Sequence, residues 1–111
     1  MRIWLDAILS VVFAPECAAC GSPLAHPTAG SVCAACWRAV RPMPPPFCRI
    51  CGDSLLTLDR AADLCVRCQE SPPTVERARS AGIHDGTLRT IVHALKYDGR
   101  RSLARPLAAL M

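Results

Sequence analysis

The first sixteen residues carry the spacing of a helix with one apolar side. The positions that form this stripe are Ile3, Trp4, Ala7, Ile8, Val11 and Val12. Residues three and four apart share a helix face, and Pro15 ends the pattern, so we predict a helix over residues 1–14. The run is too short to span a bilayer, and Asp6 interrupts it without a cleavage site following. We therefore assign residues 1–16 to an N-terminal amphipathic helix of a cytoplasmic protein that has no membrane span.

A second block of helical spacing lies in the C-terminal third. Its apolar positions fall at Leu88, Ile91, Val92 and Leu95. This spacing predicts a helix over Thr87–Tyr97, with Asp85 as its N-terminal cap and Gly99 as its stop. A further helix follows, with Leu103, Leu107, Leu110 and Met111 on one side. The moderate alternation of Val75–Ile83 predicts a strand before these two helices.

Between these blocks the periodicity is replaced by turns, prolines and cysteines. Eight cysteines form four Cys-x-x-Cys pairs. The pairs are Cys17 with Cys20, Cys33 with Cys36, Cys48 with Cys51 and Cys65 with Cys68. Two such pairs place four thiolates around one metal ion, and Cys₄ is a common structural zinc site. The spacing therefore predicts two structural Zn²⁺ ions, each closed by four cysteines and without an open catalytic position.

The cysteine pairs lie in an internal repeat. Cys17-Ala-Ala-Cys20-Gly21-Ser-Pro-Leu24 matches Cys48-Arg-Ile-Cys51-Gly52-Asp-Ser-Leu55, and a second Cys-x-x-Cys pair closes each copy. The repeat indicates two copies of one small unit, residues 17–36 and 48–68, within a double zinc ribbon over residues 17–70. Duplicated units favour sequential pairing of ligands, whereas a cross-brace joining the first pair to the third remains the alternative. A rubredoxin-like iron site and a dithiol redox pair are the rival uses of the same cysteines.

Length and charge add two constraints. With 111 residues, units of about 25 residues cannot bury enough apolar surface alone, so metal is expected to supply the missing stability. The formal net charge is +4, and two zinc ions with eight thiolates bring the loaded chain close to zero. Positive charge gathers in residues 77–111, so Lys96, Arg100 and Arg101 are candidate contacts for nucleic acid or phosphate. The alternative is that these cations are simply solvated near a helix C-terminus.

The pattern predicts a small metal-bound α+β fold: an N-terminal helix, tandem zinc ribbons, then a strand and two helices. The ribbons are expected to be pairs of β-hairpins. The last apolar stripe runs to Leu110 and Met111 without a cap. We therefore expect either that the chain is the front of a longer protein or that a partner covers this surface.

Two segments together resemble the ComF family, also called the ComF/GntX family. They are Phe13-Ala14-Pro15-Glu16-Cys17 with the four cysteine pairs after it, and the helix ending in Leu95-Lys96-Tyr97-Asp98-Gly99. Members of this family join a double zinc ribbon to a phosphoribosyltransferase-like domain. The resemblance implies that residues 75–111 begin such a domain, incomplete here, and that the protein acts near DNA uptake and competence. It also implies single-stranded DNA, a competence protein or the missing C-terminal domain as partners.

The resemblance does not supply catalytic residues. Phosphoribosyltransferases hold ribose with an acidic pair and phosphate with a Thr/Gly-rich loop, and this sequence has neither. We therefore predict that the chain is inactive alone and name no catalytic residue. Three functions remain open: the zinc-binding module of a ComF-type phosphoribosyltransferase-like protein, a non-catalytic scaffold that binds nucleic acid or protein, and a dithiol redox protein.

Overall fold

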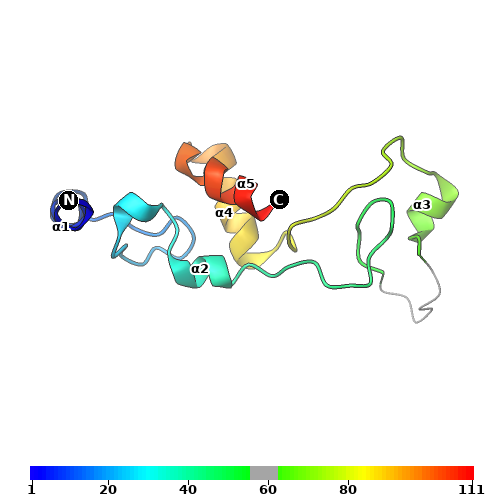
Figure 1. Cartoon of the computed structure of the whole chain (residues 1–111), viewed down its shortest axis with the longest axis horizontal. Coiled ribbons are helices and arrows are strands. Elements are labelled where there is room, and N and C mark those ends of the chain that lie inside the picture. Colours follow the sequence, from blue (N-terminus) through cyan, green and yellow to red (C-terminus); the bar gives the residue numbers. More distant parts are fainter. Residues whose placement is uncertain (56–62) are drawn as a thin grey trace. The chain divides into compact units, whose positions relative to one another are not determined.

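The computed structural model describes residues 1–55 and 63–111 and contains short helices joined by turns (Figure 1). In chain order the helices are α1 (Arg2–Phe13), η1 (Pro27–Ala29), α2 (Ala34–Arg38), α3 (Val66–Glu70), α4 (Gly86–Tyr97), η2 (Arg101–Leu103) and α5 (Ala104–Leu110). The predicted helices at the N-terminus and at residues 87–97 are confirmed. The helix predicted after Gly99 is also present, and a 3₁₀ turn leads into it.

Two compact units divide the chain. The first unit contains residues 1–41 and 84–111, and the second contains residues 42–83. Each unit carries one of the two cysteine-rich repeats. The C-terminal helices therefore belong with the first repeat, although the second repeat separates them from it in sequence.

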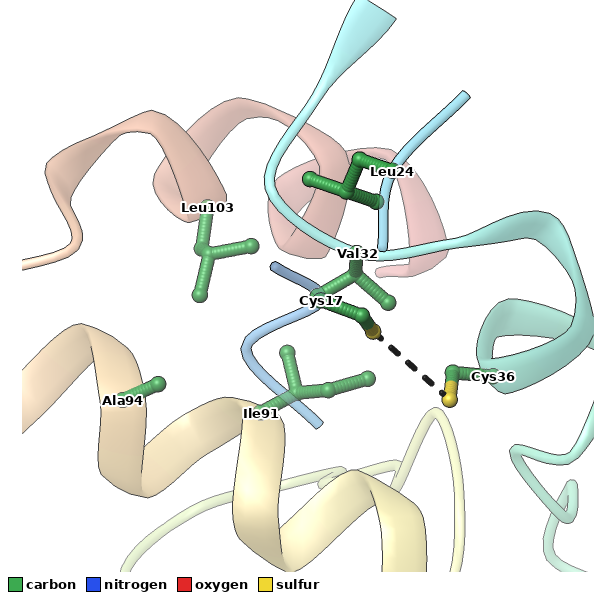
Figure 2. Close-up of a cluster of buried hydrophobic side chains, with 7 residues drawn as sticks. All are labelled: Cys17, Leu24, Val32, Cys36, Ile91, Ala94 and Leu103. Atoms are coloured by element: carbon green, nitrogen blue, oxygen red, sulfur yellow. Dashed lines mark hydrogen bonds between the residues drawn. The ribbon is translucent and has the colours of Figure 1, made fainter. Parts of the chain in front are cut away.

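The first unit is organised around one apolar cluster (Figure 2). The side chains in this cluster are Cys17, Leu24, Val32, Cys36, Ile91, Ala94 and Leu103. Ile91 of α4 is 0% exposed and Leu103 is 1% exposed, so these residues supply the aliphatic centre against which the cysteine turn packs. The helical spacing of Leu88, Ile91 and Ala94 explains why α4 buries this side toward the repeat.

Helix α1 turns its apolar stripe outward. Trp4 is 76% exposed and Val11 is 85% exposed, whereas Asp6 is buried at 7%. The cause is a polar contact with the first repeat, where Asp6 Oδ1 accepts a 2.9 Å hydrogen bond from the Thr28 amide. Asp6 Oδ2 also lies 3.6 Å from His26 Nδ1. A buried carboxylate needs such partners, and these partners fix which side of α1 faces the repeat.

Replacing Asp6 with alanine is expected to release α1 from the first repeat. The Thr28 hydrogen bonds lower the Asp6 pKa, so this contact stabilises the fold at pH above the ordinary 3.8 and is lost as pH falls through the lowered value. Hydrogen exchange should accelerate at the Thr28 amide and along α1 in the variant. Ser10→Ala is the control, because the Ser10 hydroxyl bonds only the Ala7 carbonyl of its own helix. Unchanged exchange at Thr28 in Asp6→Ala would contradict this anchor.

The predicted strand at Val75–Ile83 is wrong. This segment is irregular, and its backbone contact with the second repeat is a 2.6 Å hydrogen bond from the Ala78 amide to the Ile50 carbonyl. A strand needs a neighbour that takes its alternating donors and acceptors, and this segment instead runs against a turn. β-pairing in the described residues is limited to two isolated bridges, Glu16 with Pro23 and Phe47 with Ser54. Within the described parts of the two ribbons, a single bridge therefore stands where each hairpin pair was expected.

The predicted cap of α4 is correct in position but not in chemistry. Asp85 is the residue before the helix, yet its side chain makes no capping hydrogen bond. Its carboxylate instead pairs with the Arg41 guanidinium. The ion pair joins the segment that follows α2 (Ala34–Arg38) to the start of α4, a contact that sequence spacing does not reveal.

Candidate metal centre

Each repeat opens with a turn that we call a knuckle: the first knuckle spans residues 17–21 and the second spans residues 48–52. Their backbone hydrogen bonds match one for one. The Gly21 amide and the Gly52 amide each donate a 2.9 Å hydrogen bond to the carbonyl of the first cysteine in their own knuckle. Both glycines have φ of 74°, a left-handed conformation that glycine reaches without a Cβ clash. The repeat found in the sequence is therefore a repeat of backbone geometry.

The second cysteine pair of each repeat lies at the start of a short helix. Cys33 precedes α2 and Cys65 precedes α3, with φ of −72° and −71° and the same ψ of 157°. This arrangement puts Cys36 and Cys68 in the first turn, where both are buried. These two helices were not predicted from the sequence, because five residues are too few to show a helical period.

Four sulfur atoms converge in each unit. The groups are Cys17, Cys20, Cys33 and Cys36, and Cys48, Cys51, Cys65 and Cys68, with the sulfurs of each group within 4.8 Å of one another. The structure thus groups the pairs sequentially rather than as a cross-brace. Figure 2 shows the Cys17 and Cys36 sulfurs turned toward each other at 3.8 Å. The Cys20–Cys33 and Cys51–Cys65 sulfurs lie 3.9 Å and 3.7 Å apart.

These separations fit a metal rather than a disulfide. A tetrahedron with Zn–S bonds of about 2.3 Å has edges of about 3.8 Å, whereas bonded sulfurs lie about 2.05 Å apart. All eight cysteines are free thiols in the structure. The donor set and its spacing therefore match a closed tetrahedral site in each unit.

Hydrogen bonds from backbone amides stabilise the thiolate form of one cysteine in each group. Burial opposes the Cys17 thiolate, but the amides of Cys33, Cys20 and Ala19 outweigh it and lower the Cys17 pKa to about 6. The Cys33 and Ala19 amides lie 3.3 Å and 3.4 Å from the Cys17 sulfur. In the second group the Cys65 amide is the main cause, and it lowers the Cys48 pKa to about 6 against the effect of burial.

The last cysteine of each group behaves in the opposite way. Burial, reinforced by the neighbouring thiols, raises the Cys68 pKa to about 12. The same causes raise the pKa of Cys36. Four thiolates in one place repel one another, so a divalent cation is required before the last cysteine deprotonates.

Zinc is expected to leave the protein in acid. Compared with the ordinary thiol pKa of 9.0, the values of about 6 at Cys17 and Cys48 mean that their contribution is complete above pH 9 and lost as pH falls to about 6. Zinc binding displaces the remaining thiol protons, so the affinity of both sites for zinc should fall as pH is lowered. A metallochromic indicator measures the release. A zinc affinity that does not change between about pH 9 and about pH 6 would contradict these protonation states.

The two centres differ in what surrounds them. All four inner positions of the first repeat are alanine, and Ala18 and Ala19 pack against the apolar cluster of the first unit. The second repeat has Arg49 and Arg67 at inner positions, and both are exposed. A hydrogen bond to the Cys51 side chain, together with the negative charge of its thiolate, raises the pKa of the Arg67 guanidinium. Arg67 was not predicted as a site residue from the sequence, although it stands where the first repeat has Ala35.

The cations predicted to contact phosphate lie elsewhere. Lys96 is in the last turn of α4, and Arg100 and Arg101 follow at the start of η2. All three are exposed residues of the first unit. Their contact with nucleic acid or phosphate remains a prediction. Within residues 1–55 and 63–111, no helix combines the length and apolar character needed to cross a bilayer.

Comparison with known proteins agrees with this geometry. A model of the double zinc ribbon domain matches residues 8–69. The chain is 35% identical over 95 residues to the DNA utilization protein YhgH of Salmonella typhi, and equally to that of Salmonella typhimurium. The alignments cover 86% of this chain but 40% of each relative. No solved structure matches the chain. With two four-cysteine groups built for two structural zinc ions, the chain belongs to the double zinc ribbon family.

Proposed function

We propose that this chain is the zinc-stabilised module of a ComF-type protein that handles DNA in the cytoplasm. The observation that carries the proposal is the pair of tetrahedral cysteine groups, in a chain similar to proteins named for DNA utilization. The chain spans about 40% of the length of those relatives, so their whole activity enters here only as a proposal.

The metal has a structural role in this proposal. All eight cysteines serve as ligands, four to each zinc, and this leaves no position for water or substrate. Bound zinc supplies the cross-link that holds two small repeats folded. The chain's own residues then present cations and rings to a partner rather than perform a reaction.

Phosphoribosyltransferase-like chemistry would belong to a segment joined to this module. The support is the resemblance of Leu95 to Gly99 to the ComF signature. Residues 75–111 would supply two helices to that segment but no catalytic residue. Their role is to attach it to the first zinc unit through the apolar cluster around Ile91.

A second candidate is a scaffold for another protein. The outward apolar stripe of α1 favours it, because Trp4, Val11 and Val12 lie exposed while Asp6 holds the helix in place. A competence protein or the C-terminal domain would cover this stripe. In this case the module fixes the partner's position, and DNA contact is not required.

Two experiments test the proposal. In the native host, removal of the gene should reduce incorporation of labelled DNA, and a copy encoding Cys17→Ser and Cys48→Ser should fail to restore it. In solution, the zinc-loaded chain should bind single-stranded DNA weakly, with an affinity that falls as salt is raised. Normal DNA incorporation without the gene would refute the DNA role. Binding to a partner protein but not to DNA would favour the scaffold.

A further inference from the structure

The side of α4 opposite the apolar cluster carries a distinct set of residues. Leu88, Ile91 and Ala94 bury one side of the helix. Arg89, His93 and Tyr97 recur every four residues on the other side, so they form one row along the surface. We call this row, together with the adjacent Thr90 and Lys96, the outward face of α4. The Ile91 side chain is 0% exposed, so packing of Ile91 fixes the position of α4 and of its outward face.

A row of three rings begins at His84, just before α4, and continues along this face with His93 and Tyr97. The His84 and His93 ring centroids are 6.1 Å apart, and the His93 and Tyr97 centroids are 5.4 Å apart. His93 meets Tyr97 nearly edge-on, with an interplanar angle of 85°. Tyr97 is nevertheless 75% exposed. A large ring that is supported on its side but open to solvent is a surface on which another flat ring can stack.

Cations flank the rings. Arg89 and Lys96 lie on the same face and are exposed, and Arg100 follows the end of the helix. A hollow of about 400 Å³ lies beside Arg89 and is lined by Gly86, Arg89, Thr90, His93 and Asp98. Asp98 is the carboxylate that opposes these cations, since Asp85 is already paired with Arg41. The local charge is therefore positive and favours an anionic ligand. The exposed rings favour a ligand that also has flat rings.

We propose that the outward face of α4 binds single-stranded nucleic acid, with a base stacked on Tyr97 and phosphates on Arg89, Lys96 and Arg100. The inference rests on the proposed role with DNA and assigns it to particular residues. Single-stranded binding combines cations along the backbone with aromatic platforms for bases. In a duplex the base faces are already stacked on each other, so Tyr97 would gain nothing. An acidic peptide would use the cations but leave the rings without a function.

The test separates base stacking from charge. Binding of the zinc-loaded chain to an oligothymidylate of about fifteen nucleotides is measured by fluorescence anisotropy, beside an abasic strand of equal length. Tyr97→Ala should weaken binding to the oligothymidylate by about 5- to 150-fold, and Tyr97→Phe should bind normally. Neither change should alter binding to the abasic strand. Trp4→Ala is the control, because it removes an exposed ring of the same unit from a different helix.

A second variant pair tests the phosphate contacts. Log affinity falls as log salt concentration rises, and Arg89→Gln should make this fall less steep by about 0.7 on both strands. Arg105→Gln makes the same charge change at an exposed position of α5 and should leave the slope near its original value. Zinc content must be unchanged in every variant, so that misfolding is not mistaken for lost contacts.

The outcomes distinguish the inference from the proposal on which it rests. If the chain binds the oligothymidylate and Tyr97→Ala binds equally well, the stacking role is wrong while the DNA role stands. If Tyr97→Ala weakens both strands equally, the ring acts through folding and the inference also fails. If the unchanged protein binds neither strand at low salt, the DNA role itself is wrong. Preference for duplex over single strand would likewise overturn the assignment.

Discussion

Cys48→Ser is expected to remove one zinc ion and unfold the second unit. Among the described residues, the buried apolar side chains of that unit are Cys48 and Cys68, both zinc ligands. A structural zinc contributes on the order of 10–16 kcal/mol at neutral pH, which is as large as the whole stability of a typical domain. Loss of the ion therefore leaves the second unit without a comparable source of stability.

Cys17→Ser should have a different outcome, because the first unit has an aliphatic cluster besides its metal. Ile91 and Leu103 are almost fully buried there, so part of the helical structure should survive the loss of the first zinc. Elemental analysis should find about one zinc per chain in each variant. Circular dichroism and hydrogen exchange should find α4 better preserved than any part of the second unit.

Thr74→Ala is a suitable control, since Thr74 is an exposed residue of the second unit. It should retain both zinc ions and the same exchange pattern. Thiol-reactive reagents give an independent check. Zinc-bound thiolates should react only after a chelator is added, whereas a dithiol redox protein would react without it. Two zinc ions in Cys48→Ser, or a protected second unit without its ion, would contradict the metal-dependent fold.

The features that the sequence predicted are those set by local spacing. The i, i+3, i+4 pattern of Leu88, Ile91 and Val92 is enough to predict α4, since any helix with that pattern has one apolar side. The cysteine groups follow from two short turns of fixed length, and the structure brings together the sulfurs of each repeat.

The features that the sequence did not predict depend on contacts between distant segments. The stripe of α1 was visible, but its direction depends on a hydrogen bond from Thr28 to Asp6 across 22 positions. Likewise, alternation in Val75–Ile83 suggested a strand because the pattern carries no information about a partner strand. The helices α2 and α3 are too short for periodicity, and their place is set by the cysteine at each helix start.

Replacing the knuckle glycines should separate backbone strain from steric overlap. Gly21 and Gly52 share a φ of 74°, so alanine costs about 1–2 kcal/mol at either position. A Cβ on Gly21 meets nothing within 4 Å, whereas a Cβ on Gly52 would lie 2.7 Å from the Ala78 carbonyl oxygen. That oxygen belongs to the backbone, so relief requires movement of the whole segment. Overpacking of this kind adds about 1–3 kcal/mol.

Gly52→Ala should therefore weaken the second zinc site by about 2–5 kcal/mol, because binding and folding are one event in such units. Gly21→Ala should weaken the first site only by the strain of about 1–2 kcal/mol. Competition with a chelator measures both affinities. Asparagine tolerates the left-handed conformation, so Gly21→Asn should be nearly neutral, whereas Gly52→Asn should stay as damaging as alanine. Equal losses at the two positions would show that residues 78–79 do not cover the second knuckle.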